Sequence, residues 1–117
     1  MLFRSKAANI LKYMAPIKAA KILEYMAQTE EGAKKVAKIL DNMTQTEEGA
    51  TKAAKILENM TLTKAAYILE YYMTPTKAVK ILECMMPTKA ANILDNMRIL
   101  NVMDIVIYMA QTEEGAK

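Results

Sequence analysis

The chain has 117 residues, with 16 basic and 13 acidic side chains, a net charge of +3, a hydrophobic content of 53% and no histidine. This length allows one domain, and the mild charge does not require a nucleic-acid partner. The lack of histidine removes the commonest general base and a common metal ligand. A lone cysteine, Cys84, cannot form an internal disulfide, so we expect a reducing, cytoplasmic setting. We expect neither a secretion signal nor a membrane span, because no apolar run approaches the about 20 residues that cross a bilayer.

Taken in chain order, the sequence is a repeated unit of the form Lys-Ala-Ala-x-Ile-Leu-Glu/Asp-x-Met. Copies lie at 6–14, 18–26, 35–43, 52–60, 64–73 (with one extra residue), 77–85 and 89–97, followed by a degenerate copy at 101–109 and a partial repeat at 110–117. One such unit cannot bury its own apolar face. We therefore expect residues 1–117 to form a single helical-repeat domain.

Within each unit, counted from the lysine as position 0, the apolar residues fall at positions +1, +2, +4, +5 and +8. This spacing is a helical stripe rather than a strand alternation. Each helix of about ten residues would be marginal alone, so its neighbours must hold it. The sequence predicts an all-α fold, an α-solenoid or superhelix of about eight short helices with 12- and 17-residue periods.

The junctions between units are of two kinds. In the short junctions, prolines mark breaks and a hydroxyl just before the lysine is the expected N-cap; these residues are Pro16, Pro75, Pro87, Ser5, Thr63, Thr76 and Thr88. The long junctions carry Gln-Thr-Glu-Glu-Gly-Ala at 28–33 and 45–50. There Thr29 and Thr46 are the expected N-caps, with glutamates in the first turn. The third and fourth helices should therefore start earlier and run about one turn longer.

The segment from Pro75 to Met85, Pro-Thr-Lys-Ala-Val-Lys-Ile-Leu-Glu-Cys-Met, resembles the repeat in the N-terminal domain of MgtE-type magnesium channels. Similar helical repeats occur in FliG and MotE. The resemblance covers nearly the whole chain and implies a superhelical stack of short helices. In the channels this domain is rich in acidic residues that help to sense magnesium, whereas the repeats here carry lysines. The resemblance therefore implies the fold and no metal site.

Two ladders of charge run along the repeats. Lysines at position 0 are Lys6, Lys18, Lys35, Lys52, Lys64, Lys77 and Lys89, and a second row at +3 is Lys21, Lys38, Lys55 and Lys80. Acids at +6 are Glu24, Asp41, Glu58, Glu70, Glu83 and Asp95. We interpret the ladders as a salt-bridge lattice, within helices and between the acid end of one helix and the lysine end of the next. The alternative is a basic groove for phosphates. The acids are one repeat position copied, not a catalytic pair.

The last repeat is unusual. It is apolar nearly all round, through Ile99, Leu100, Val102, Ile105, Val106 and Ile107. The string at 110–117 is identical to that at 27–34. Two interpretations are open: a truncated duplication with a frayed tail, or an array that continues into the next molecule.

The function predicted from these features is that of a structural, self-associating repeat protein that forms head-to-tail filaments, tubes or rings. The expected interface consists of Leu2, Phe3, Ile10, Ile99, Leu100, Ile105, Ile107, Thr112, Glu113 and Glu114. The alternatives are a monomeric adaptor that binds a helix or peptide on its concave face, and a nucleic-acid-binding solenoid. No enzyme activity, catalytic residue, metal or cofactor is expected. Near-identical copies also allow an artificial or recently duplicated origin.

Overall fold

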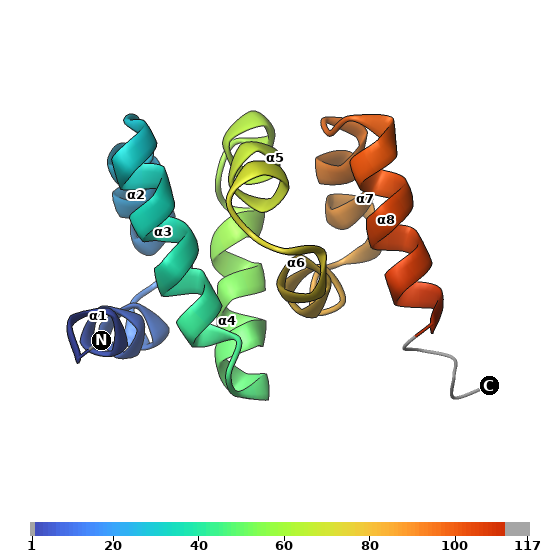
Figure 1. The fold of residues 1–117 in the computed structure, drawn as a ribbon. Coiled ribbons are helices and arrows are strands. Elements are labelled where there is room, and N and C mark those ends of the chain that lie inside the picture. Colours follow the sequence, from blue (N-terminus) through green and yellow to red (C-terminus); the bar gives the residue numbers. More distant parts are fainter. Residues whose placement is uncertain (1, 112–117) are drawn as a thin grey trace.

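A computed structural model describes the backbone of residues 2–111 and the side chains of residues 6–111. Within these residues the chain forms eight helices and no strand, as the repeat count predicted (Figure 1). The helices are α1 (Leu2–Tyr13), α2 (Pro16–Met26), α3 (Glu30–Met43), α4 (Glu47–Glu58), α5 (Leu62–Tyr71), α6 (Pro75–Leu82), α7 (Pro87–Asp95) and α8 (Ile99–Met109).

The two long junctions start their helices as predicted. Thr29 and Thr46 are the N-caps of α3 and α4, and each hydroxyl oxygen accepts the N–H of the glycine three residues on, at 3.0 Å. Each helix then carries two glutamates in its first turn, where the helix dipole favours negative charge. With 14 residues, α3 is the longest helix in the described part of the chain.

These junctions also need glycine. A Cβ atom at Gly32 would lie 1.7 Å from the carbonyl oxygen of Met26, and one at Gly49 would lie 2.0 Å from that of Met43. Each glycine therefore allows the start of one helix to approach the end of the preceding helix more closely than any side chain would permit.

The predicted caps of the short junctions are wrong. Pro75 and Pro87 are the first residues of α6 and α7, so Thr76 and Thr88 lie inside the first turn, and Thr63 and Ser5 also lie within helices. Proline suits the first helical position because its φ angle is already helical and its missing N–H needs no partner there. The N-caps are instead Thr61, Thr74 and Met86, and of these only Thr74 accepts a hydrogen bond through its side chain.

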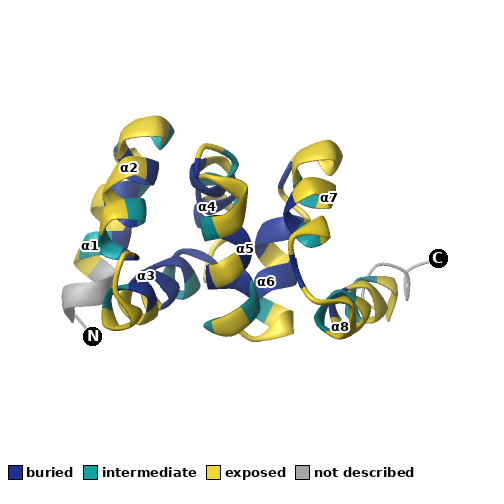
Figure 2. Ribbon diagram, turned by 90° about the horizontal axis from the view of Figure 1, so that it is seen from above, coloured by how far each residue is buried: buried dark blue, intermediate teal, exposed yellow. Residues whose placement is uncertain are grey.

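Helices two places apart in the chain pack against each other along the whole array, as in the pairs α1 with α3, α4 with α6 and α6 with α8, and α3 also packs against its neighbours α2 and α4. The two ends of the molecule are therefore α1 with α2 and α7 with α8 (Figure 1). One core of Ala, Leu, Ile, Val and Met side chains runs between the helices, and their outer faces are exposed (Figure 2). None of the helices described is long and apolar enough to cross a bilayer.

Candidate functional site

The isoleucine at position +4 faces the preceding helices. From α3 to α8 this residue is buried at every repeat, as Ile39, Ile56, Ile68, Ile81, Ile93 and Ile105. In α1 and α2 the same residue is exposed, with Ile10 at 61% and Ile22 at 43%. Because each helix packs on the helix two places before it, the first two helices lack the neighbour that covers position +4 elsewhere.

Positions +2 and +5 show the opposite trend. The leucine at +5 is buried in the first six repeats, as Leu11, Leu23, Leu40, Leu57, Leu69 and Leu82. In the last two repeats Leu94 is half-buried and Val106 is 48% exposed. Position +2 is likewise buried in the first six repeats and exposed at Ala91 and Met103. These two positions, three residues apart and so on one helix face, pack against the following helices.

The molecule therefore has two unlike apolar ends. We call Ile10 and Ile22 the N-terminal end surface, and Ala91, Leu94, Met103 and Val106 the C-terminal end surface. Repeat arrays that stay monomeric usually carry polar residues on their terminal repeats. Here the ends keep the apolar residues that the inner helices bury against each other, and exposed apolar patches of this kind mark interaction sites.

The structure exposes some residues of the interface predicted from sequence and buries another. Ile10 belongs to the N-terminal end surface, and Ile99, Leu100 and Ile107 are exposed on α8. Ile105, in contrast, is only 3% exposed and lies in the core, so it is not available to a partner. The side chains of Leu2 and Phe3, and residues Thr112, Glu113 and Glu114, lie outside the described residues.

Sequence reasoning missed Ile22, Leu94, Met103 and Val106. The signal was present in the repeat itself. Positions +4 and +5 point to adjacent but different sides of the helix, because successive residues differ by about 100° in a helix of 3.6 residues per turn. One side can be covered only by an earlier helix and the other only by a later one.

The acids at +6 form the second recurring feature of the structure. Oxygen Oε2 of Glu24 accepts the N–H of Thr61, Oε2 of Glu58 accepts that of Met86 at 2.9 Å, and Oε2 of Glu70 accepts that of Arg98 at 2.9 Å. These contacts join α2 to α5, α4 to α7 and α5 to α8, which is three helices along in each case. The receiving helices have no side-chain cap of their own. Each carboxylate accepts the N–H of the N-cap residue, as the glutamate of a capping box does, and places negative charge at the positive end of the helix dipole.

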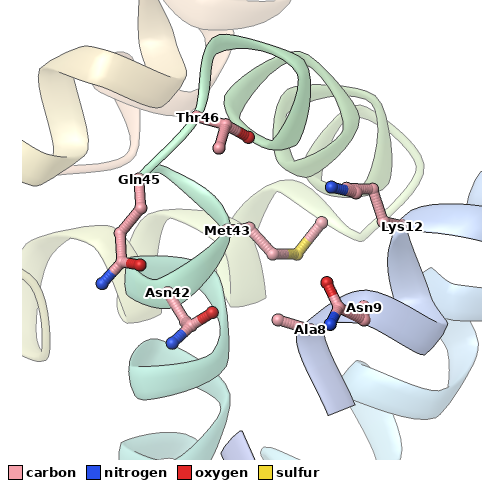
Figure 3. Close-up of a pocket in the computed structure, with 7 residues that line it drawn as sticks. All are labelled: Ala8, Asn9, Lys12, Asn42, Met43, Gln45 and Thr46. Atoms are coloured by element: carbon pink, nitrogen blue, oxygen red, sulfur yellow. The ribbon is translucent and has the colours of Figure 1, made fainter. Parts of the chain in front are cut away.

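Two other helices show what happens when the receiving helix is already capped. The N-terminus of α6 has its own cap in Thr74, and Asp41 of α3 instead approaches Lys77, with 2.8 Å between Oδ1 and Nζ. That contact has the distance of an ion pair without the alignment of a good hydrogen bond. In α1 the +6 residue is Lys12, and it lines the same hollow as Thr46, the N-cap of α4 (Figure 3).

The carboxylate of Glu70 is almost fully enclosed, since its side chain is 4% exposed. Besides the backbone of Arg98, it accepts a hydrogen bond of 2.6 Å from the side-chain amide of Asn101. Arg98 also donates to the hydroxyl of Tyr71 and lies over its ring at 5.0 Å. Asn101 stands at position 0, where the other repeats have lysine, and it contacts the +6 acid of the helix three places before it, as Lys77 contacts Asp41.

The predicted salt-bridge lattice is thus replaced by a different arrangement. Within the described residues the ion pairs are Lys77 with Asp41 and Arg98 with Glu70, and both join helices three places apart. The acid end of a helix does meet the start of another helix, but that helix is the third one along and the usual donor is a backbone N–H.

A cluster of tyrosines lies on α5. The ring of Tyr67 contacts those of Tyr71 and Tyr72, with centroids 5.5 and 5.3 Å apart, and the hydroxyls of Tyr67 and Tyr72 lie 3.0 Å apart. The hydrogen bond with Tyr67, in which the Tyr72 hydroxyl donates, and desolvation raise the pKa of Tyr72 to about 12. The Tyr72 phenol is therefore neutral near pH 7.

No protein-family model, curated protein or solved structure matches this chain. The resemblance to the MgtE-type domain accordingly stays a prediction. Within the described residues no three Asp, Glu or Cys side chains converge on a point where a metal ion could bind. The function must be argued from the end surfaces and the carboxylate contacts.

Proposed function

We propose that this protein is an α-solenoid that associates head to tail, with the N-terminal end surface of one copy on the C-terminal end surface of another. The observation that carries the proposal is the reversal of burial along the array. Position +4 is exposed only in the first two repeats, and positions +2 and +5 are no longer fully buried only in the last two, where Leu94 is half-buried and the other three residues are exposed. In a second copy, the C-terminal end surface can cover the N-terminal end surface of the first copy, and the reverse holds at the other end.

The size of the two surfaces sets the strength of association. Covering the exposed part of each larger side chain contributes about 1 kcal/mol. Association costs about 4 kcal/mol or more in lost freedom of motion. A few such side chains on each end therefore support a contact that forms at high protein concentration and dissociates on dilution.

The two surfaces differ, so the contact is heterologous. A heterologous contact leaves one free end of each kind after every addition, and it grows into a ring if the rotation closes or into a helical filament if it does not. An isologous dimer would instead join two identical surfaces and stop.

Light scattering over a concentration series tests the proposal. The wild-type chain should show a mass that rises with concentration above its 13.1 kDa. Ile22→Lys and Val106→Lys should each abolish large assemblies without loss of helical circular dichroism, because both side chains are already about half exposed. Leu62→Lys is the matched control, since Leu62 is 40% exposed but lies in the first turn of α5, away from both ends.

Mixing the two variants decides the geometry. Ile22→Lys keeps its C-terminal end surface and Val106→Lys keeps its N-terminal end surface. An equimolar mixture should form a species of twice the monomer mass, whereas each variant alone stays monomeric. A discrete dimer of either variant alone would show an isologous contact and overturn the head-to-tail arrangement.

The two alternative functions have their own outcomes. A wild-type chain that stays monomeric at every concentration would overturn self-association and favour the adaptor. A nucleic-acid-binding solenoid would bind a generic oligonucleotide at physiological salt and lose binding when Lys18, Lys35 and Lys52 are neutralised. We expect no such binding, because the 16 basic side chains are offset by 13 acidic ones and the net charge is only +3.

A further inference from the structure

We propose that the register of the assembly is set by the carboxylate of Asp95, which reaches the start of α2 in the next copy. This inference rests on the proposed head-to-tail association and adds to it a specific pair of groups. It follows from the three-helix spacing of the +6 contacts. We continue the count of three helices from the end of one copy into the start of the next. On this count α6 meets α1 of the next copy, α7 meets α2 and α8 meets α3.

A helix start that could bind this carboxylate is present on α2. Of the helices α2 to α8, four have no side-chain cap of their own, namely α2, α5, α7 and α8. Three of these receive a carboxylate from within the chain. The fourth is α2, whose N-cap is Ala15, followed three residues later by the exposed lysine Lys18.

The carboxylates that could make such a contact are present on α6 and α7. Glu83 and Asp95 occupy position +6, both are exposed, and neither forms an ion pair with another described residue. Asp95 has the short side chain of Asp41, which pairs with the position-0 lysine of the third helix along. The equivalent partner of Asp95 is Lys18 of the next copy.

The remaining helix of the C-terminal end fits the same scheme. Position +6 of α8 is Ile107, and its third helix along is α3 of the next copy, which is capped by its own Thr29. The same relation holds inside the chain. Position +6 of α1 is Lys12, and the third helix along from α1 is α4, which is capped by its own Thr46. The helices α3 and α4 begin with the long junctions and are capped by their own threonines. In both cases the helix three places before them has no acid at position +6.

Charge reversal tests the pair. We expect Asp95→Lys and Lys18→Asp each to weaken association about tenfold, because each places like charges together, and the double variant to recover most of that loss. Asp104→Lys and Lys34→Asp are matched controls, since both residues are exposed and neither occupies position 0 or +6. They should leave association within about twofold of wild type.

Cross-linking tests the same register independently. Tyr71 at +7 contacts Arg98, the N-cap of the helix three places along, so Tyr71→Cys with Arg98→Cys should cross-link within one chain. The equivalent pair between copies is Asn96→Cys with Ala15→Cys, in a background in which the exposed Cys84 is replaced by Ser. A short bismaleimide should then give a ladder of multimers on a denaturing gel, and neither single variant should do so.

The outcomes separate this inference from the proposed function. If the wild-type chain assembles and the Ile22→Lys and Val106→Lys mixture behaves as expected, but the double charge reversal restores nothing, the register is wrong and head-to-tail association stands. The same holds if only the intramolecular pair cross-links. If the wild-type chain does not assemble, both proposals fall together.

Discussion

The contact between Glu58 and the start of α7 provides a sharp test of the three-helix spacing. Oε2 of Glu58 accepts the N–H of Met86 at 2.9 Å, and α7 has no side-chain cap of its own. This bond matches the glutamate half of a capping box, and losing a helix cap costs about 0.5–2 kcal/mol; a carboxylate beside the start of a helix adds about 0.3–1 kcal/mol through the dipole. We expect Glu58→Ala to lower the free energy of unfolding by about 1.5 kcal/mol.

Glu83→Ala is the matched control for Glu58→Ala. Glu83 occupies the same position, +6, but it is exposed and caps no helix within the described residues. Removing it should change the free energy of unfolding by less than about 0.5 kcal/mol. Glu70→Ala should cost more, about 2–3 kcal/mol, because the enclosed amide of Asn101 would lose its acceptor.

The assay is urea unfolding followed by far-ultraviolet circular dichroism. All three substitutions are made in the Ile22→Lys background, so that association between copies does not contribute to stability. The reasoning would be refuted if Glu83→Ala cost as much as Glu58→Ala. Equal costs would mean that the acids stabilise their own helices rather than the third helix along.

Three further substitutions test the core, the long junction and the tyrosine cluster. Leu57→Ala should cost about 2–5 kcal/mol in urea unfolding, because Leu57 is fully buried. Gly49→Ala should lower the melting temperature measured by circular dichroism, since a Cβ there would lie 2.0 Å from the carbonyl oxygen of Met43 and the two helices would have to separate. Tyr67→Phe should lower the pKa of Tyr72 from about 12 towards its ordinary 10.0 in an ultraviolet titration. In the wild-type chain the raised pKa stabilises the fold fully below pH 10.0, and this contribution is lost as the pH rises through about 12.

The sequence by itself determined the features that depend on near neighbours in the chain. The helical period, the number of helices and the early starts of α3 and α4 all follow from residues a few positions apart. The caps of Thr29 and Thr46 act over three residues, so they too could be predicted. The short junctions were predicted wrongly although their signal is equally local, because the hydroxyl residue just before the lysine was given the role that belongs to a residue earlier in the junction.

Only the tertiary structure decided which side of each helix meets which neighbour and where each carboxylate acts. Glu24, Glu58 and Glu70 act on backbone groups 37, 28 and 28 residues away, a separation that no local pattern specifies. The same residue type at +4 is core in Ile56 and surface in Ile22, because burial depends on whether another helix lies two places before it. Similar repeat units occur along the whole chain, but the free energy of each depends on its neighbours, and those are set by the packing of the whole array.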